Sequence, residues 1–251
     1  MHFKEKLKKR KLAIGSWLSI ANPAIAEIMA KAGADWLAID MEHTALSTDQ
    51  CQELIRVIDL CGVTPLVRVG ANDPLLIKRA MDAGAKGVIV PMVNSAKDAM
   101  DAVKAVKYPP RGTRGVGLAR AQGYGTTFNE YVKAIDDQSI VIVQIEHKDA
   151  LKHLEDIFAV KGVDGFIVGP YDLSASLGIA GDFKAKKMEK ALHQIEQTAK
   201  TKNMAAGYHV VYPDPDLVNQ KIKQGYTFIA YSVDFLLLGE SFSQGLKAIK
   251  K

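Results

Sequence analysis

The chain has 251 residues, and 48% of them are apolar, which can supply a substantial core and argues against extensive disorder. The net charge of +5 mildly favours anionic ligands, but the lysines are dispersed over many segments, so we expect no nucleic-acid-binding footprint. No apolar run reaches the roughly 18 residues that a membrane-spanning helix needs, so we expect no contact with a membrane.

The chain begins with a basic segment, KEKLKKRK, at residues 4–11. Phe3 and Leu7 lie at helical spacing, so we predict a short amphipathic helix with a solvated lysine face rather than a basic arm. The start also resembles a secretory signal, but Gly15 and two serines interrupt the apolar stretch, and a helical pattern follows directly over residues 23–32. We therefore expect no cleaved signal here.

Eight short apolar runs follow one another along the chain, with helical patterns between them. The runs predict strands at residues 12–17, 36–40, 65–69, 87–91, 140–146, 165–170, 205–210 and 228–234. Apolar residues at three- and four-residue spacing predict helices in segments such as 23–34, 48–62, 73–85 and 214–226. Several helical segments open on Asp, Ser or Asn and close on Gly, which are residues that start and stop helices.

The nearly continuous apolar character of these strands is typical of parallel sheets covered on both faces. Eight strand–helix units predict an α/β fold of the (β/α)₈ TIM barrel type, as one domain over residues 1–251. An open doubly wound sheet is the alternative, but no dinucleotide-binding loop follows the first strand. The segment GTRGVG at residues 112–117 lacks the G-x-G-x-x-G spacing, and we predict that it forms a long functional loop after the fourth strand.

Two cysteines, Cys51 and Cys61, lie on one predicted helix. Their spacing matches no zinc or redox motif. We therefore expect reduced thiols and a cytoplasmic protein.

Polar residues gather where the predicted strands end. Active sites of parallel barrels lie at the carboxyl ends of the strands, so these residues are the candidates for chemistry. In chain order they are Asp40, Glu42, His43, Arg68, Gln144, Glu146 and Asp172.

Glu146 and Asp172 would come from adjacent strands and would repel each other unless a cation lay between them. A hard divalent metal would resolve this repulsion, and it would leave coordination positions for water and substrate oxygens. The alternative is that both carboxylates cap helices in ordinary loops.

Arg68 needs an anionic partner, either a structural carboxylate or a substrate carboxylate. His43 is the best candidate for acid/base work, because Asp40 lies three residues before it and could orient the ring. His209 ends the seventh strand and could also face the barrel mouth. The remaining histidines lie in segments that read as helical or terminal, where solvated or satisfied side chains are expected.

The motifs resemble those of the HpcH/HpaI aldolases, which are metal-dependent class II pyruvate aldolases. The match runs nearly end to end and includes GSWLSIANPAIAEIMAKAGADWLAIDMEH, PLVRVGANDPLLIKRAMDAGAKGVIVPMVNSAKDA, YPPRGTRGVG, VQIE and GVDGFIVGPYDLSASLG, in the family's order. The resemblance implies a barrel of the phosphoenolpyruvate/pyruvate type. It also implies a homo-hexamer, a trimer of dimers, in which C-terminal helices are exchanged between subunits.

The resemblance assigns roles to particular residues. It implies that Glu146 and Asp172 bind Mg²⁺, Mn²⁺ or Co²⁺, that His43 and Asp40 form a catalytic dyad, and that Asp82 lies near a subunit contact. The implied substrate-binding residues are Arg68, Gln144, Gly169, Pro170, Tyr171 and Trp17. His147, Tyr171 and the segment GYHVVYPDPD around His209 depart from familiar members, so the aldehyde pocket is where this chain should differ.

The resemblance implies reversible cleavage of a 4-hydroxy-2-oxo acid to pyruvate and an aldehyde. A Schiff-base aldolase would need a lysine on a strand, and none of the eight predicted strands contains one. Two alternatives are a carbon–carbon lyase for acyl-CoA esters, related to the citrate-lyase β subunit, and a non-catalytic barrel subunit.

Overall fold

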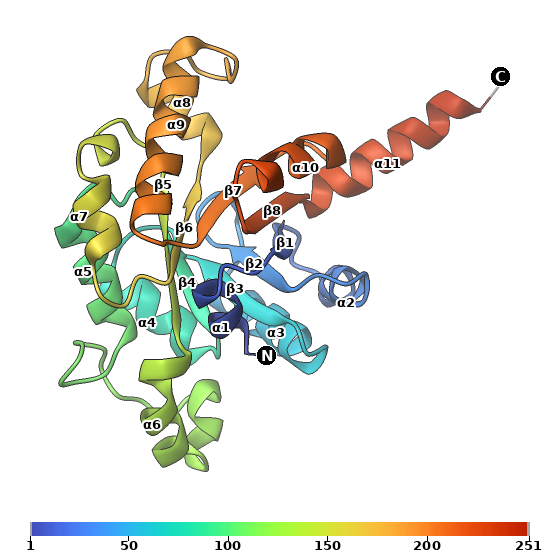
Figure 1. The fold of residues 1–251 in the computed structure, drawn as a ribbon. Coiled ribbons are helices and arrows are strands. Elements are labelled where there is room, and N and C mark those ends of the chain that lie inside the picture. The colour runs from blue at the N-terminus through green and yellow to red at the C-terminus, as the bar shows by residue number, and fades with distance from the viewer. Residues whose placement is uncertain (1, 250–251) are drawn as a thin grey trace.

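Parallel strands form a closed barrel in which each strand pairs with the next along the chain and β8 pairs with β1. The computed structural model describes residues 2–249 (Figure 1). The strands are β1 (Ala13–Leu18), β2 (Trp36–Asp40), β3 (Thr64–Arg68), β4 (Gly87–Val90), β5 (Ile140–Ile145), β6 (Gly165–Val168), β7 (Ala206–Val210) and β8 (Phe228–Val233). The predicted (β/α)₈ fold is confirmed, and the closed sheet excludes the doubly wound alternative.

Helices alternate with these strands and surround the barrel (Figure 1). They are α1 (Phe3–Lys8), α2 (Pro23–Lys31), α3 (Thr48–Leu60), α4 (Pro74–Asp82), α5 (Ala96–Val106), α6 (Phe128–Gln138), α7 (Leu154–Ala159), α8 (Pro170–Ser176), α9 (Lys186–Thr201), α10 (Pro215–Lys223) and α11 (Asp234–Ala248). Two 3₁₀ segments are η1 (Arg120–Gly125) and η2 (Ala150–Lys152). The predicted start signals are confirmed at Asn22, Asp73 and Asp214, each of which caps a helix whose first residue is proline.

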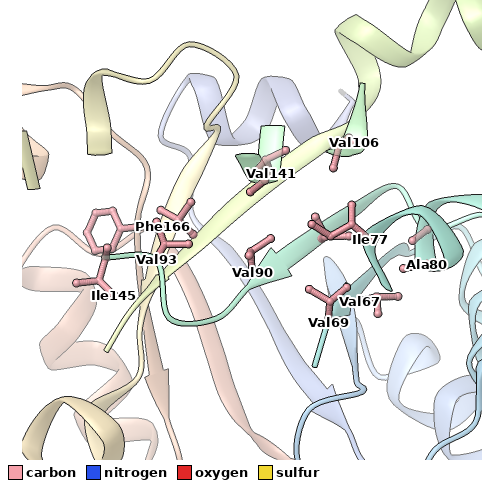
Figure 2. Close-up of a cluster of buried hydrophobic side chains, with 14 of the residues drawn as sticks. Val67, Val69, Ile77, Ala80, Val90, Val93, Val106, Val141, Ile145 and Phe166 are labelled. Carbon is pink, nitrogen blue, oxygen red and sulfur yellow. The ribbon is translucent and has the colours of Figure 1, made fainter. Parts of the chain in front are cut away.

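The core has two layers because each strand is buried on both faces. Outward-facing residues such as Val67, Val141 and Phe166 pack against Ile77 and other residues of the helices (Figure 2). Inside the barrel, the Trp36 and Phe228 rings stack with their centroids 4.3 Å apart. Gly15 lies against this stack, and a Cβ atom there would lie 2.2 Å from the Trp36 carbonyl oxygen. Only glycine therefore fits at this point of β1.

Helix α1 closes the amino end of the barrel. Its buried Phe3 and Leu7 belong to the inner core layer, and the Phe3 and Phe228 ring centroids lie 6.4 Å apart. The predicted amphipathic helix is confirmed, but Lys4 departs from the predicted solvated face. Its Nζ atom is buried, donates a hydrogen bond to the Ser139 carbonyl oxygen and lies 3.2 Å from Asp164 Oδ1.

The segment GTRGVG does not occupy the predicted position. Helix α5 separates it from β4, so it precedes β5 and lies at the amino ends of the strands, opposite the barrel mouth. There the buried Arg114 guanidinium lies 2.5 Å from Asp82 Oδ1, and Thr113 N–H donates to the Lys104 carbonyl oxygen. The segment therefore contributes no residue to the mouth of its own barrel.

Helix α11 extends away from the barrel (Figure 1). Its first residue, Asp234, is buried and accepts hydrogen bonds from the N–H groups of Ser19 and Ile20, each at 2.8 Å. Over residues 2–249, no helix combines the length and apolar character needed to cross a membrane.

Candidate active site

A cavity of about 250 Å³ lies at the carboxyl ends of the strands. This is the end at which (β/α)₈ barrels place their active sites. The residues that line the cavity are Trp17, His43, Arg68, Gln144, Ile167, Val168, Gly169, Pro170, Tyr171, Asp172, His209 and Val211. All six residues expected from the sequence to bind substrate therefore lie around one cavity.

Asp40 ends β2 and forms a two-point ion pair with Arg68, which ends β3. Arg68 donates from Nε to Asp40 Oδ1 at 2.9 Å and from Nη2 to Oδ2 at 2.6 Å. Asp40 Oδ1 also accepts the backbone N–H groups of Glu42 and His43. Burial raises the pKa of Asp40, but Arg68 and these amides outweigh it and hold the pKa below its ordinary value.

The His43 side chain lies at the edge of the cavity and is 61% exposed. The sequence predicted that Asp40 would orient the His43 ring. The only atom of His43 that the Asp40 carboxylate contacts is the backbone N–H, and the side-chain partner of Asp40 is Arg68. The nearest carboxylate to the ring is Glu42, whose Oε2 lies 3.6 Å from His43 Nε2. Residues 41–44 bend directly after β2, and the Asp40 carboxylate contacts the Arg68 side chain instead of the imidazole.

Glu42 had no role assigned from the sequence, yet it lies at the centre of the charged residues. Its Oε2 lies 3.4 Å from Arg68 Nε, and within the described residues this buried oxygen has no hydrogen-bond partner. Burial, partly offset by Arg68 and reinforced by Glu146, Asp40 and Asp172, raises the pKa of Glu42 to about 7. The sequence offered one signal, because Glu42 follows the strand-end residue Asp40 by two positions and therefore also lies near the barrel mouth.

A Glu42→Gln variant tests this account. The raised pKa means that burying the charged form opposes folding, so wild-type stability falls as the pH rises from about 4.5 to about 7. We expect the variant to raise the free energy of unfolding by about 1–2 kcal/mol at pH 8 and much less at pH 4.5, after allowance for partial solvation. Urea unfolding in EDTA measures both values. The exposed Glu155→Gln is the control, and an equal gain at both pH values would contradict the account.

Glu146 follows β5 and is held from two sides. Its Oε1 accepts the Met92 N–H at 2.7 Å, and its Oε2 accepts a hydrogen bond from the Gln144 amide. Burial raises the pKa of Glu146, although the Gln144 and Met92 contacts partly offset the effect. A Cβ atom at Gly169 would lie 2.8 Å from Glu146 Oε2, so glycine leaves the space that this carboxylate occupies.

The residues at the mouth fit a hard divalent cation. Glu146, Asp172 and Glu42 repel one another electrostatically, and the Gln144 Oε1 and Glu42 Oε2 acceptors are buried without partners in the described structure. An added cation would remove the repulsion and pair these oxygens. Between residues 2 and 249, no three His, Cys, Asp or Glu side chains are grouped closely enough to form a metal site by themselves. A cation at the mouth would therefore need water or substrate oxygens in addition to carboxylates. Magnesium is commonly bound in this way.

The capping alternative fails for both carboxylates. Gly169 is the N-cap of α8, which places Asp172 inside the first turn. Glu146 accepts the N–H of Met92, which lies in the β4–α5 loop and not in the helix that follows Glu146.

The floor of the cavity combines one cation with two ring systems. The Arg68 guanidinium lies over the Trp17 ring, 4.4 Å from its centroid, and the His209 ring lies 5.5 Å from the Trp17 ring. Burial and the nearby Arg68 charge lower the pKa of His209 to about 3, so the imidazole is neutral at pH 7. Arg68 therefore carries the positive charge of the cavity floor at pH 7.

The GPYD segment contributes shape more than hydrogen-bond donors. Gly169 N–H donates to the Ile145 carbonyl oxygen and Pro170 has no N–H, so these two predicted contacts do not offer free amides. Tyr171 lines the cavity and is 43% exposed. Asp82 lies at the opposite end of the barrel, where it pairs with Arg114.

The family model described as HpcH/HpaI aldolase/citrate lyase matches residues 13–240. The 2-dehydro-3,6-dideoxy-6-sulfogluconate aldolase of Pseudomonas putida is 39% identical over 245 residues, which cover 97% of this chain and 95% of the relative. The 4-hydroxy-2-oxo-heptane-1,7-dioate aldolase of Shigella sonnei is 38% identical over 241 residues, which cover 95% and 91% of the two chains.

A solved structure agrees with these relatives. It is that of an HpcH/HpaI aldolase/citrate lyase family protein from Burkholderia cenocepacia, which shares 35% sequence identity with a TM-score of 0.93. The alignment covers 98% of this chain and 97% of that one. Sequence and fold therefore match over nearly the whole chain.

Proposed function

Since the chain belongs to the HpcH/HpaI aldolase/citrate lyase family, we propose that it is a metal-dependent aldolase that reversibly cleaves a 4-hydroxy-2-oxo acid to pyruvate and an aldehyde. Both named relatives are aldolases, so the predicted enzyme class, a carbon–carbon lyase, is confirmed. The observation that carries the substrate proposal is that Arg68, His43 and Asp172 line a single cavity at the barrel mouth.

In this proposal, Glu146 and Asp172 hold a divalent cation, with Gln144 beside it. When bound, the cation acts as a Lewis acid that stabilises negative charge on the keto oxygen of the substrate. Mg²⁺, Mn²⁺ and Co²⁺ are the candidate ions, because the donors are carboxylate and amide oxygens.

Arg68 binds the carboxylate of the keto acid and shares the negative charge that develops during cleavage. Its own position is fixed by two hydrogen bonds to Asp40 and by the Trp17 ring beneath it. His43 removes the proton of the C4 hydroxyl group as the C3–C4 bond breaks, and the electron pair of that bond passes to the pyruvate enolate. Asp40 acts as a positioning residue, because it anchors Arg68 and the backbone that carries His43.

Metal removal tests the proposal directly. We expect dialysis against EDTA to lower cleavage of 4-hydroxy-2-oxo acids at least about a hundredfold, and Mg²⁺, Mn²⁺ or Co²⁺ to restore it. Borohydride with pyruvate should not inactivate the enzyme, since no strand of the barrel carries a lysine. Full activity in EDTA, or turnover of a CoA thioester but no 4-hydroxy-2-oxo acid, would rule the proposal out.

The proposed assembly is a homo-hexamer, a trimer of dimers that exchange α11, with Asp82 near a subunit contact. Helix α11 supports this assembly, because Phe235, Leu238, Phe242 and Leu246 are at least half exposed on a helix that extends from the barrel. Such spacing places an apolar stripe along one side of the helix. We also propose a cytoplasmic location, in keeping with the two free cysteines.

A Leu238→Glu/Phe242→Glu variant tests the role of α11. Each apolar side chain contributes roughly 1.5–3 kcal/mol when buried, so the double substitution should shift the protein from hexamers toward monomers at micromolar concentration. Light scattering coupled to gel filtration measures the mass. Gln244→Glu adds charge elsewhere on the same helix and should leave the mass unchanged. A double variant that keeps the wild-type mass would show that this stripe is not an interface.

A further inference from the structure

The side of the active-site cavity that faces solvent carries three aromatic side chains from three separate segments. Tyr171 is the second residue of α8, Phe183 precedes α9, and Tyr212 lies between β7 and α10. Their exposed fractions are 43%, 37% and 57%, respectively. The Tyr171 and Phe183 rings meet edge to face with centroids 5.0 Å apart, and burial together with the neighbouring Tyr212 raises the pKa of Tyr171. We call these three residues the aromatic rim.

The aromatic rim is continuous with the active-site cavity. Tyr171 lines the cavity itself, and Val211 lines it immediately before Tyr212. Below the rim, the cavity wall continues with Ile167, Val168 and Pro170. An apolar surface therefore runs from the rim toward the reacting groups. Contiguous exposed apolar surface beside a cavity is typical of a ligand-binding site.

The charges of the cavity decide which end of the substrate meets the rim. Arg68 is the permanent cation among the cavity-lining residues, and it lies on the floor against Trp17. The proposed function assigns it to the carboxylate of the keto acid, so the keto acid occupies the floor. The aldehyde portion then extends past His43 toward the aromatic rim, and no Lys or Arg besides Arg68 lines the cavity along this path.

We propose that the aldehyde partner of this enzyme carries an uncharged aromatic or bulky apolar tail, which packs on Tyr171, Phe183 and Tyr212. This inference rests on the proposed aldolase function and specifies its substrate class. In the synthetic direction, C3 of pyruvate loses a proton, its electron pair forms the bond to the aldehyde carbon, and the aldehyde oxygen gains a proton. No oxidant, reductant or further reactant is needed.

Three aldehydes separate the effect of a ring from the effect of a charge. They are 3-phenylpropanal, butanal and 4-oxobutanoate, each condensed with pyruvate in the presence of Mg²⁺ or Mn²⁺. Butanal and 4-oxobutanoate have chains of equal length and differ in charge, and 4-oxobutanoate is the aldehyde that cleavage of a 4-hydroxy-2-oxo-heptane-1,7-dioate would release. We expect kcat/KM to be at least about tenfold higher for 3-phenylpropanal than for 4-oxobutanoate, with butanal between them.

Variants of the rim locate the preference. In Tyr171→Ala and in Phe183→Ala, the ratio of kcat/KM for 3-phenylpropanal to that for butanal should fall about fivefold to tenfold, mainly through a higher KM for the aromatic aldehyde. The ratio cancels any effect on the metal or on pyruvate, because both reactions share them. Tyr171→Phe keeps the ring and should keep the ratio. Tyr124→Ala removes a 66% exposed tyrosine at the amino end of the barrel and is the matched control.

The outcomes are distinct. A wild-type preference for 4-oxobutanoate over 3-phenylpropanal, or a ratio that stays within twofold of wild type in both alanine variants, would overturn the inference and leave the aldolase proposal standing. Absence of product from pyruvate with all three aldehydes would overturn the proposed function together with the inference that rests on it.

Discussion

A Glu146→Gln variant is expected to fold normally and to lose about a thousandfold in kcat/KM for cleavage of a 4-hydroxy-2-oxo acid. The amide has nearly the shape of the carboxylate, so its oxygen can still accept the Met92 N–H that now lies 2.7 Å from Oε1. The substitution removes one of the two negative charges proposed to hold the metal. Steady-state kinetics over a range of Mn²⁺ concentrations measures both the loss of rate and the weaker metal binding.

Although Glu146→Gln should lower activity, it should raise the stability of the metal-free protein. Burial raises the pKa of Glu146, so its charged form is costly in the folded protein at neutral pH. In EDTA at pH 8, Glu146→Gln should therefore unfold at a higher urea concentration than the wild type. Glu130→Gln, an exposed substitution on α6, should change neither quantity. Activity within tenfold of wild type at every Mn²⁺ concentration would remove Glu146 from the proposed metal site.

Strand order and strand ends could be predicted because they depend on local patterns. A buried parallel strand needs an apolar run, and a capping residue favours a helix start, as at Asp73 and Asp214. Once eight such units close into a barrel, their carboxyl ends must meet. The sequence therefore predicts that Arg68, Gln144 and Asp172 lie at one end of the barrel, and all three line the cavity there.

Side-chain partners were harder to predict because they depend on the path of the chain after each strand. Asp40 could contact either the His43 ring or Arg68, and in the folded chain its carboxylate contacts the Arg68 guanidinium. Lys4 belongs to a basic run that favours solvation, yet the closed barrel end brings Ser139 and Asp164 close enough to bury its charge. The predicted position of GTRGVG, directly after the fourth strand, is wrong because α5 lies between β4 and this segment.

An Arg68→Met variant is expected to lose both activity and stability. Arg68 and Asp40 side chains are 12% and 6% exposed, so removing the guanidinium leaves a buried carboxylate without its partner. Breaking such a pair costs about 3–5 kcal/mol of unfolding free energy. Loss of the proposed carboxylate-binding group should lower kcat/KM by about a thousandfold or more. Urea unfolding and steady-state kinetics measure the two losses separately.

The pH dependence and a second substitution identify the cause of each loss. In the wild type the pKa of Asp40 is held below its ordinary value, so the ion pair stabilises the fold at neutral pH and this contribution disappears as the pH falls through that lowered pKa. In Arg68→Met, burial without the guanidinium raises the pKa of Asp40, so the stranded carboxylate takes up a proton at mildly acidic pH. The stability deficit of the variant should therefore be largest near pH 7 and shrink toward pH 4. Adding Asp40→Asn removes the stranded charge and should restore at least half of the lost stability, but not the activity, because the keto acid still lacks its cation. Recovery of activity in the double variant would show that Arg68 acts only by neutralising Asp40. An unchanged stability deficit would show that the Arg68–Asp40 pair does not anchor this end of the barrel.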